Sequence, residues 1–167
     1  MDSAELRNQL CRMLVVRQAH MDFEDAVADF PAEHINTRPP HCDYSFWHLV
    51  EHIRICQKDI LDYIADEHYA WPNFPDDLWP DKSAETDITG WNQSISQFFA
   101  DRQALIDIIN DPAVDLFAPL PNSGEYQHNI LREINIIANH NAYHTGELGV
   151  LRQVMDLWRT ADKALDG

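Results

Sequence analysis

The chain has 167 residues, of which 45% are hydrophobic, a size and composition typical of one soluble globular domain. Its 28 acidic residues outnumber its 12 lysines and arginines, which gives a formal net charge of −16. Such a charge repels the phosphates of nucleic acids and the surface of an anionic membrane, so neither is expected as a partner. We expect a single domain over residues 1–167 that acts on a small-molecule substrate.

The termini and the cysteines indicate the compartment. The N-terminus is polar, has no basic start followed by an apolar run, and no window approaches 18 uninterrupted apolar residues. Three cysteines, Cys11, Cys42 and Cys56, are an odd number without the spacing of a disulfide scaffold. These features predict a cytoplasmic protein with reduced thiols.

The N-terminal third is predicted to hold two helices. Apolar residues recur at helical spacing from about Ala4 to Phe30, where Asp2 can cap the helix and Glu5 stands at capping-box spacing. A second helix is expected after Ser45, a favourable N-cap residue, and ends near Asp66.

The rest of the chain predicts two more helices joined by long connections. Residues 69–80 are rich in aromatic residues and prolines and are expected to pack over the bundle as a lid. A third helix runs from Asp87 or Thr89 to Asn110, and a loop at 116–124 leads into a fourth. Because no segment alternates like a strand, the fold class is all-α, a four-helix bundle with crossover loops.

The fourth predicted helix, from Ile130 to Trp158, carries polar residues in its apolar seam. Asn141 and His144 fall where the pattern asks for large apolar side chains, and His140 precedes His144 by one turn. Four residues correspond to about 40° of rotation and about 6 Å of rise, so the two rings can converge on one point. Such a pair is common as hydrogen-bonded histidines, so a metal site needs a third ligand.

His52 is the third candidate ligand. It lies about two turns into the second predicted helix, beside the apolar stripe, where its ring would point into the bundle. With His140 and His144 it would give three nitrogen ligands and leave a coordination position open, as catalytic sites do. Nitrogen ligands suit transition metals, and we expect zinc or nickel.

Other residues near this set leave alternatives open. Cys56 could close the site with sulfur, although a buried cysteine more often packs as a small apolar residue. His48 lies in the first turn of its helix, where its ring can hydrogen-bond the helix entrance instead of binding metal. Four further residues are candidates for orienting the rings or moving protons: Glu51, Asn139, Tyr143 and Glu147.

A rival motif overlaps the second helix. His48, Glu51 and His52 read as His-x-x-Glu-His, the inverted zinc-peptidase motif, in which the glutamate is the general base. That reading leaves His140 and His144 unexplained, and a chain of 167 residues has little room for a peptide cleft.

Four segments carry a family pattern: residues 45–53 (Ser-Phe-Trp-His-Leu-Val-Glu-His-Ile), 78–80 (Leu-Trp-Pro), 115–117 (Asp-Leu-Phe) and 140–148 (His-Asn-Ala-Tyr-His-Thr-Gly-Glu-Leu). Together they resemble the DinB-like superfamily. The resemblance covers nearly the whole chain and is best from Ser45 to Trp158. Its motif, one histidine on the second helix and His-x-x-x-His on the fourth, implies a metal site at His52, His140 and His144.

The resemblance also implies a function. The chain is similar to metal-dependent transferases of low-molecular-weight thiols, such as bacillithiol or mycothiol, and to isomerases that use a thiol cofactor. An open metal position would bind the thiol as a thiolate, while the loops at 71–79 and 117–124 would hold a small electrophile. The alternatives are a metal-dependent hydrolase and a non-catalytic metal-binding stress protein. Exposed faces near Trp158 are where two chains would pair as a homodimer.

Overall fold

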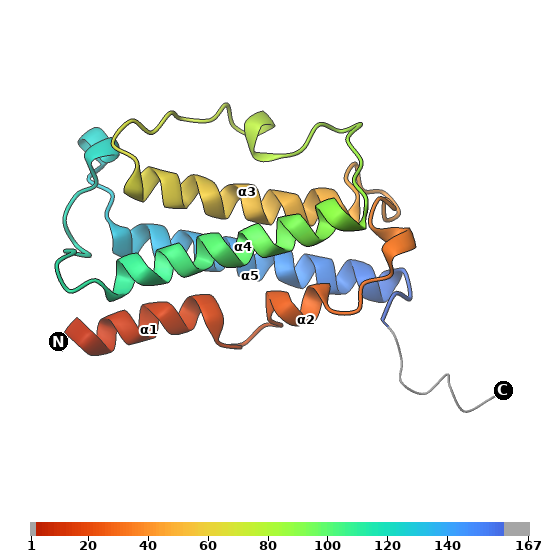
Figure 1. Ribbon diagram of the computed structural model, residues 1–167, viewed down its shortest axis with the longest axis horizontal. Helices are drawn as coiled ribbons and strands as arrows, with labels where there is room; N and C mark the ends of the chain where they lie inside the picture. Colours follow the sequence, from red (N-terminus) through yellow and green to blue (C-terminus); the bar gives the residue numbers. More distant parts are fainter. Residues whose placement is uncertain (1–2, 159–167) are drawn as a thin grey trace.

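The computed structural model describes residues 3–158 and confirms an all-α bundle (Figure 1). Four long helices and one short one carry the fold, with three short 3-10 turns in the connections and no strand within the described residues. The α-helices are α1 (Ser3–Val15), α2 (Phe23–Val27), α3 (Phe46–Ala65), α4 (Ile88–Asn110) and α5 (Ile130–Val154). The 3-10 turns are η1 (Ala32–His34), η2 (Asp76–Leu78) and η3 (Pro121–Tyr126).

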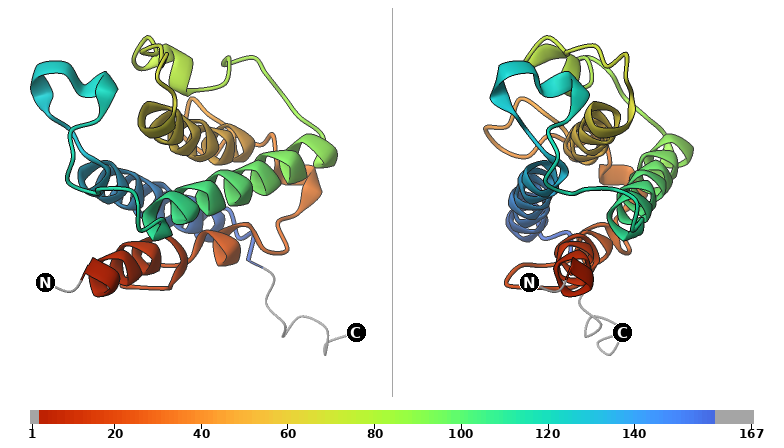
Figure 2. Two further views of the ribbon diagram at one scale, coloured as in Figure 1. Left: turned by 60° about the vertical axis from the view of Figure 1, so that its left-hand side comes forward. Right: turned by 90° about the vertical axis from the view of Figure 1, so that its left-hand side faces the viewer.

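The helices are connected in two ways. α3 and α4 run in the same direction, so the connection between them, at 66–87, returns along the outside of α3 (yellow-green in Figures 1 and 2). The connection from α4 to α5 joins neighbouring ends of the bundle instead. Among residues 3–158, no helix combines the length and the apolar character needed to cross a membrane.

The prediction of one continuous first helix is wrong. α1 ends at Val15 and α2 begins at Phe23, and the two lie end to end along one side of the bundle (Figure 1). A tertiary contact then holds the end of α2. The buried guanidinium of Arg152, on α5, donates hydrogen bonds to the carbonyl oxygens of Ala26 (2.8 Å) and Ala28 (2.9 Å) at the end of α2. Apolar spacing continues across the break and therefore could not reveal it. The predicted cap, Asp2, lies outside the described residues.

α3 begins where the sequence predicts. Ser45 is its N-cap, and its hydroxyl accepts a hydrogen bond from the backbone N–H of His48 (3.2 Å). In return, Nδ1 of His48 accepts from the backbone N–H of Ser45 (3.3 Å), which completes a capping box with histidine in place of the usual glutamate or glutamine. One ring nitrogen of His48 is thus engaged in starting the helix.

Asn141, one of the two polar residues in the apolar seam of α5, has a buried partner. The side-chain amide of Asn141 donates to Oε1 of Gln57 (3.0 Å), and the amide of Gln57 donates to the carbonyl of Phe98 on α4 (2.7 Å). Gln57 is fully buried, so this chain ties α3, α4 and α5 together inside the core without leaving its amide unpaired.

α5 ends earlier than predicted, at Val154 instead of Trp158. The backbone N–H of Leu157 donates back to the carbonyl of Arg152 (2.9 Å), and Asp156 adopts a left-handed conformation (φ 55°). The indole N–H of Trp158 then donates to the carbonyl of Gly149 (3.3 Å), so the chain folds back on the helix.

The connection at 66–87 is attached to α3 by two histidines. Nε2 of His48 lies 2.9 Å from the carbonyl oxygen of Asp81, and Nδ1 of His52 lies 2.7 Å from that of Leu78. Trp79, between them, packs as the lid prediction expects, but Trp71 and Phe74 stay 63% and 85% exposed, so the lid prediction fails for the first half of the connection. The connection is therefore anchored at its second half, next to His48 and His52.

Candidate metal centre

Three histidines from two helices converge beside this connection. Nε2 of His52 lies 3.2 Å from Nε2 of His140 and 3.3 Å from Nε2 of His144. The ligand atoms of all three lie within 4.8 Å of one another, and no other such group of His, Cys, Asp or Glu occurs among residues 3–158. The structure thus brings together the three residues that the sequence singles out, and their binding of a metal stays a prediction.

The spacing of these nitrogens fits a metal ion. Ligands held about 2.0–2.1 Å from a tetrahedral zinc ion lie about 3.3–3.4 Å from one another. The observed separations of 3.2 and 3.3 Å are close to that value. Neutral imidazoles whose lone pairs face one another at this distance repel, and a cation between them would remove the repulsion.

Hydrogen bonds at the opposite ring nitrogens orient two of the rings. Nδ1 of His52 donates to the carbonyl of Leu78, and Nδ1 of His144 donates to Oε2 of Glu147 (2.7 Å). Each donation places the proton on Nδ1 and leaves the lone pair of Nε2 directed at the cluster. The indole of Trp79 stacks on the ring of His52 (centroids 3.8 Å apart, planes 6° apart) and holds it from one face.

The charge state of the rings also suits a metal. Burial, together with the neighbouring imidazoles of His140 and His144, lowers the pKa of His52 to about 4. Burial and His144 lower the pKa of His140 as well. At neutral pH both rings are therefore uncharged, which is the form that coordinates metals.

A carboxylate and a phenol extend this network outward. The hydroxyl of Tyr44 donates a hydrogen bond to Oε1 of Glu147, whose other oxygen accepts from His144. Burial alone would raise the pKa of Glu147, but the hydrogen bonds from His144 and Tyr44 outweigh it and lower that pKa. Burial and the carboxylate of Glu147 raise the pKa of Tyr44, which keeps its proton. Sequence reasoning missed Tyr44, because its partner lies 103 residues away.

The other candidates for orienting the rings lie elsewhere. Glu51 forms a two-point ion pair with Arg54 (2.7 and 3.0 Å), and Asn139 donates to the backbone of Asn135. Tyr143 is 70% exposed. Its ring lies edge-on to that of His144 (centroids 4.8 Å apart), but of the four residues considered only Glu147 hydrogen-bonds a candidate ligand.

The inverted zinc-peptidase arrangement does not fit this geometry. Both ring nitrogens of His48 are occupied, by Ser45 at the helix cap and by the carbonyl of Asp81. The carboxylate of Glu51 is held by Arg54, in a groove that His52 does not line. His48 therefore serves the helix start, as the alternative assignment predicts.

Cys56 stands beside the cluster without being part of it. Its sulfur lies 3.8 Å from Nε2 of His52, but it does not converge with His140 and His144. Burial and the nearby carboxylate of Asp59 raise the pKa of Cys56 to about 12, so the side chain stays a thiol.

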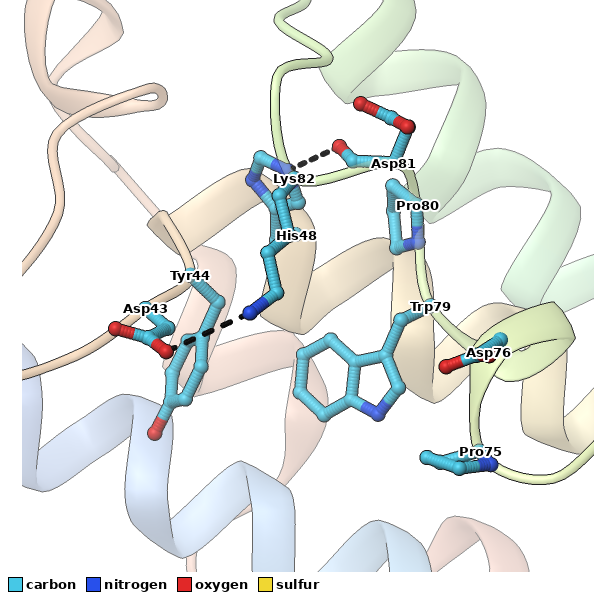
Figure 3. Close-up of a pocket in the computed structure, with 9 residues that line it drawn as sticks. All are labelled: Asp43, Tyr44, His48, Pro75, Asp76, Trp79, Pro80, Asp81 and Lys82. Atoms are coloured by element: carbon cyan, nitrogen blue, oxygen red, sulfur yellow. Dashed lines mark hydrogen bonds and ion pairs between the residues drawn. The ribbon is translucent and has the colours of Figure 1, made fainter.

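A cavity of about 510 Å³ lies next to the centre (Figure 3). Its walls include Tyr44 and Trp79, which also contact Glu147 and His52 of the centre. The two residues therefore stand between the cavity and the cluster, and none of the three histidines lines the cavity itself.

Comparison with known families supports the resemblance noted in the sequence. Searches of curated proteins and of solved structures gave no match. The family model described as the DinB superfamily matches residues 16–148, which include all three clustered histidines and most of the bundle. The chain therefore belongs to the DinB superfamily.

Proposed function

We propose that the protein is a metal-dependent enzyme that transfers a low-molecular-weight thiol to a small electrophile. The observation that supports it best is the convergence of three histidines, with Nε2 of His52 lying 3.2 and 3.3 Å from those of His140 and His144, near a cavity large enough for a small molecule. Three protein ligands leave room for an exogenous one, as catalytic sites do. Zinc and nickel are the metals that we propose for a nitrogen-only set.

The residues of the chain have distinct tasks in this scheme. A divalent metal bound at the centre would lower the pKa of a coordinated thiol and so favour its thiolate, the nucleophilic form. Glu147 and Leu78 fix the orientation of two ligand rings, and Trp79 shields one of them from water. The cavity holds the electrophile, whose leaving group departs with the electron pair of the bond that the sulfur replaces. We propose the cytoplasm as the reducing compartment that keeps such a thiol available.

Two measurements test the proposal. Elemental analysis of protein purified without an affinity tag should give about one zinc or nickel per chain. In cobalt-substituted protein, bacillithiol, mycothiol, glutathione or cysteine should change the visible spectrum, and the active thiol should be consumed together with an alkyl or aryl halide.

Three outcomes would contradict it. A protein that stays metal-free after loading would show that the three histidines bind no metal. A spectrum unchanged by every thiol would show that no thiol binds the metal. Metal-dependent turnover of chromogenic esters without any thiol would show a hydrolase instead.

A further inference from the structure

The cavity beside the candidate metal centre combines aromatic walls with an excess of negative charge. The rings of Tyr44 and Trp79 lie 5.3 Å apart between centroids and form two of its walls. Its ionic lining consists of three carboxylates, Asp43, Asp76 and Asp81, and one ammonium, Lys82, so carboxylates outnumber the ammonium by two. Aromatic faces next to carboxylates are the surroundings that organic cations prefer.

The one lysine in the lining already places an ammonium at the cavity. In Figure 3 the side chain of Lys82 extends into the space beside Tyr44 and Trp79, where its Nζ lies 3.6 Å from Oδ2 of Asp43. The side chains of this pair are 82% and 88% exposed, and ion pairs that exposed contribute little to stability. Lys82 can therefore leave the space at small cost when another cation enters.

The remaining carboxylates are not neutralised within the described part of the chain. Asp81 accepts hydrogen bonds from the backbone N–H and the hydroxyl of Ser83, which are uncharged donors. No ion pair among residues 3–158 involves Asp81 or Asp76. With the charge of Lys82 balanced by Asp43, the cavity keeps a negative balance that repels anionic ligands.

We propose that this cavity binds the ammonium group of a small organic cation, which lies against the rings of Tyr44 and Trp79 and takes the place of Lys82 beside Asp43. Under the proposed function, on which this assignment of a role rests, the bound molecule is the electrophile: an amine-bearing compound whose reactive carbon faces the metal centre. Recognition of the cation itself requires neither metal nor turnover, so it can be measured separately.

The test uses three probes with the same aromatic ring and different end groups: 2-phenylethylamine, 2-phenylethanol and 3-phenylpropionate. Titration calorimetry on the full chain, with and without zinc, should show the amine binding about 10-fold more tightly than the alcohol, a difference of about 1.4 kcal/mol. The carboxylate should bind most weakly of the three.

Substitution of Lys82 distinguishes a cation site from an anion site. Lys82→Ala removes the internal competitor and should tighten binding of the amine by about 3-fold, whereas Asp43→Asn and Asp76→Asn should each weaken it by a similar factor. Lys58→Ala, in a separate groove between α3 and α4, is the matched control and should leave binding unchanged.

The outcomes are decisive in either direction. Tighter binding of the carboxylate, lost in Lys82→Ala, would show an anion site and overturn the proposal, as would equal binding of all three probes. A preference for the amine in a protein that consumes no thiol would support the cation site and contradict the proposed function. Thiol turnover without any preference for the amine would support the proposed function and contradict the cation site.

Discussion

His48 and His52 lie one turn apart on α3, both are buried, and both contact a carbonyl oxygen of the connection at 66–87. They differ in the other ring nitrogen. Nδ1 of His48 is taken by the backbone N–H of Ser45, whereas Nε2 of His52 faces two further imidazoles. Burial and helical position therefore do not distinguish a candidate ligand from a structural histidine. The distinction comes from which nitrogen keeps a free lone pair and where that lone pair points.

The largest expected effect is loss of the metal when a clustered histidine is removed. His52→Ala, His140→Ala and His144→Ala should each reduce the metal content from about one per chain to near zero, because two imidazoles bind zinc far more weakly than three. His48→Ala should keep the metal. Elemental analysis of the four variants, purified in the same way, checks this difference. Equal metal loss in His48→Ala would contradict the assignment of the two histidines.

The second prediction concerns the pH dependence of the metal-free protein. The pKa of His52 is about 4 in the folded chain and about 6.5 in the unfolded chain, so the unfolded chain binds the proton first as the pH falls. The free energy of unfolding should therefore be unaffected by this group above pH 6.5 and decrease between pH 6.5 and 4. The loss is at most about 3 kcal/mol.

Urea denaturation in the presence of a chelator measures this effect. Other groups also titrate over the same range, so the relevant quantity is the difference between the wild type and His52→Ala. The variant should lose less stability than the wild type on acidification. Parallel curves for the two proteins would mean that His52 is not held in the neutral form by its surroundings.

The third prediction concerns the carboxylate that orients His144. Glu147→Ala removes the acceptor for Nδ1 of His144 and should weaken metal binding by about 10-fold or more, the usual effect of losing a partner of a ligand ring. Glu147→Gln keeps an acceptor oxygen and should weaken it less. Competition with a chromophoric chelator measures the affinities. If both variants bound metal as tightly as the wild type, Glu147 would have no role in positioning the ring.

Much of the fold follows from local signals, and some of it does not. α3, α4 and α5 begin close to the predicted residues because Ser45, Asp87 and Asn129 cap them with their own side chains, an interaction within one turn. The end of α2 depends instead on Arg152, whose guanidinium donates to the carbonyl of Ala26, 126 residues away in the chain. Local spacing contains no information about a contact of that range.

The candidate centre also combines contacts that local sequence predicts with contacts that it does not. His140 and His144 can be paired from sequence, since their spacing on one helix brings their rings together. That His52 meets them was expected from its position and from the family resemblance, whereas the contact between Tyr44 and Glu147 had no sequence signal. The occupied nitrogens of His48 were partly foreseeable, because a residue three positions after Ser45 is placed to complete a capping box.

The smallest expected effect returns to His48 and separates its two contacts. His48→Ala loses the acceptor for the N–H of Ser45 and the donor to Asp81, and it should lower the free energy of unfolding by about 1–2 kcal/mol with the metal retained. His48→Gln restores the sequence of a standard capping box but is too short to repeat the ring's contact with the connection, so it should recover about half of that loss. His68→Ala, at an exposed position, is the control for replacing a histidine and should have little effect. Full recovery by glutamine would mean that the helix cap alone accounts for His48. No recovery would mean that the bond to Asp81 accounts for the effect of His48 on stability. This histidine would then act mainly by holding the wall of the cavity against α3.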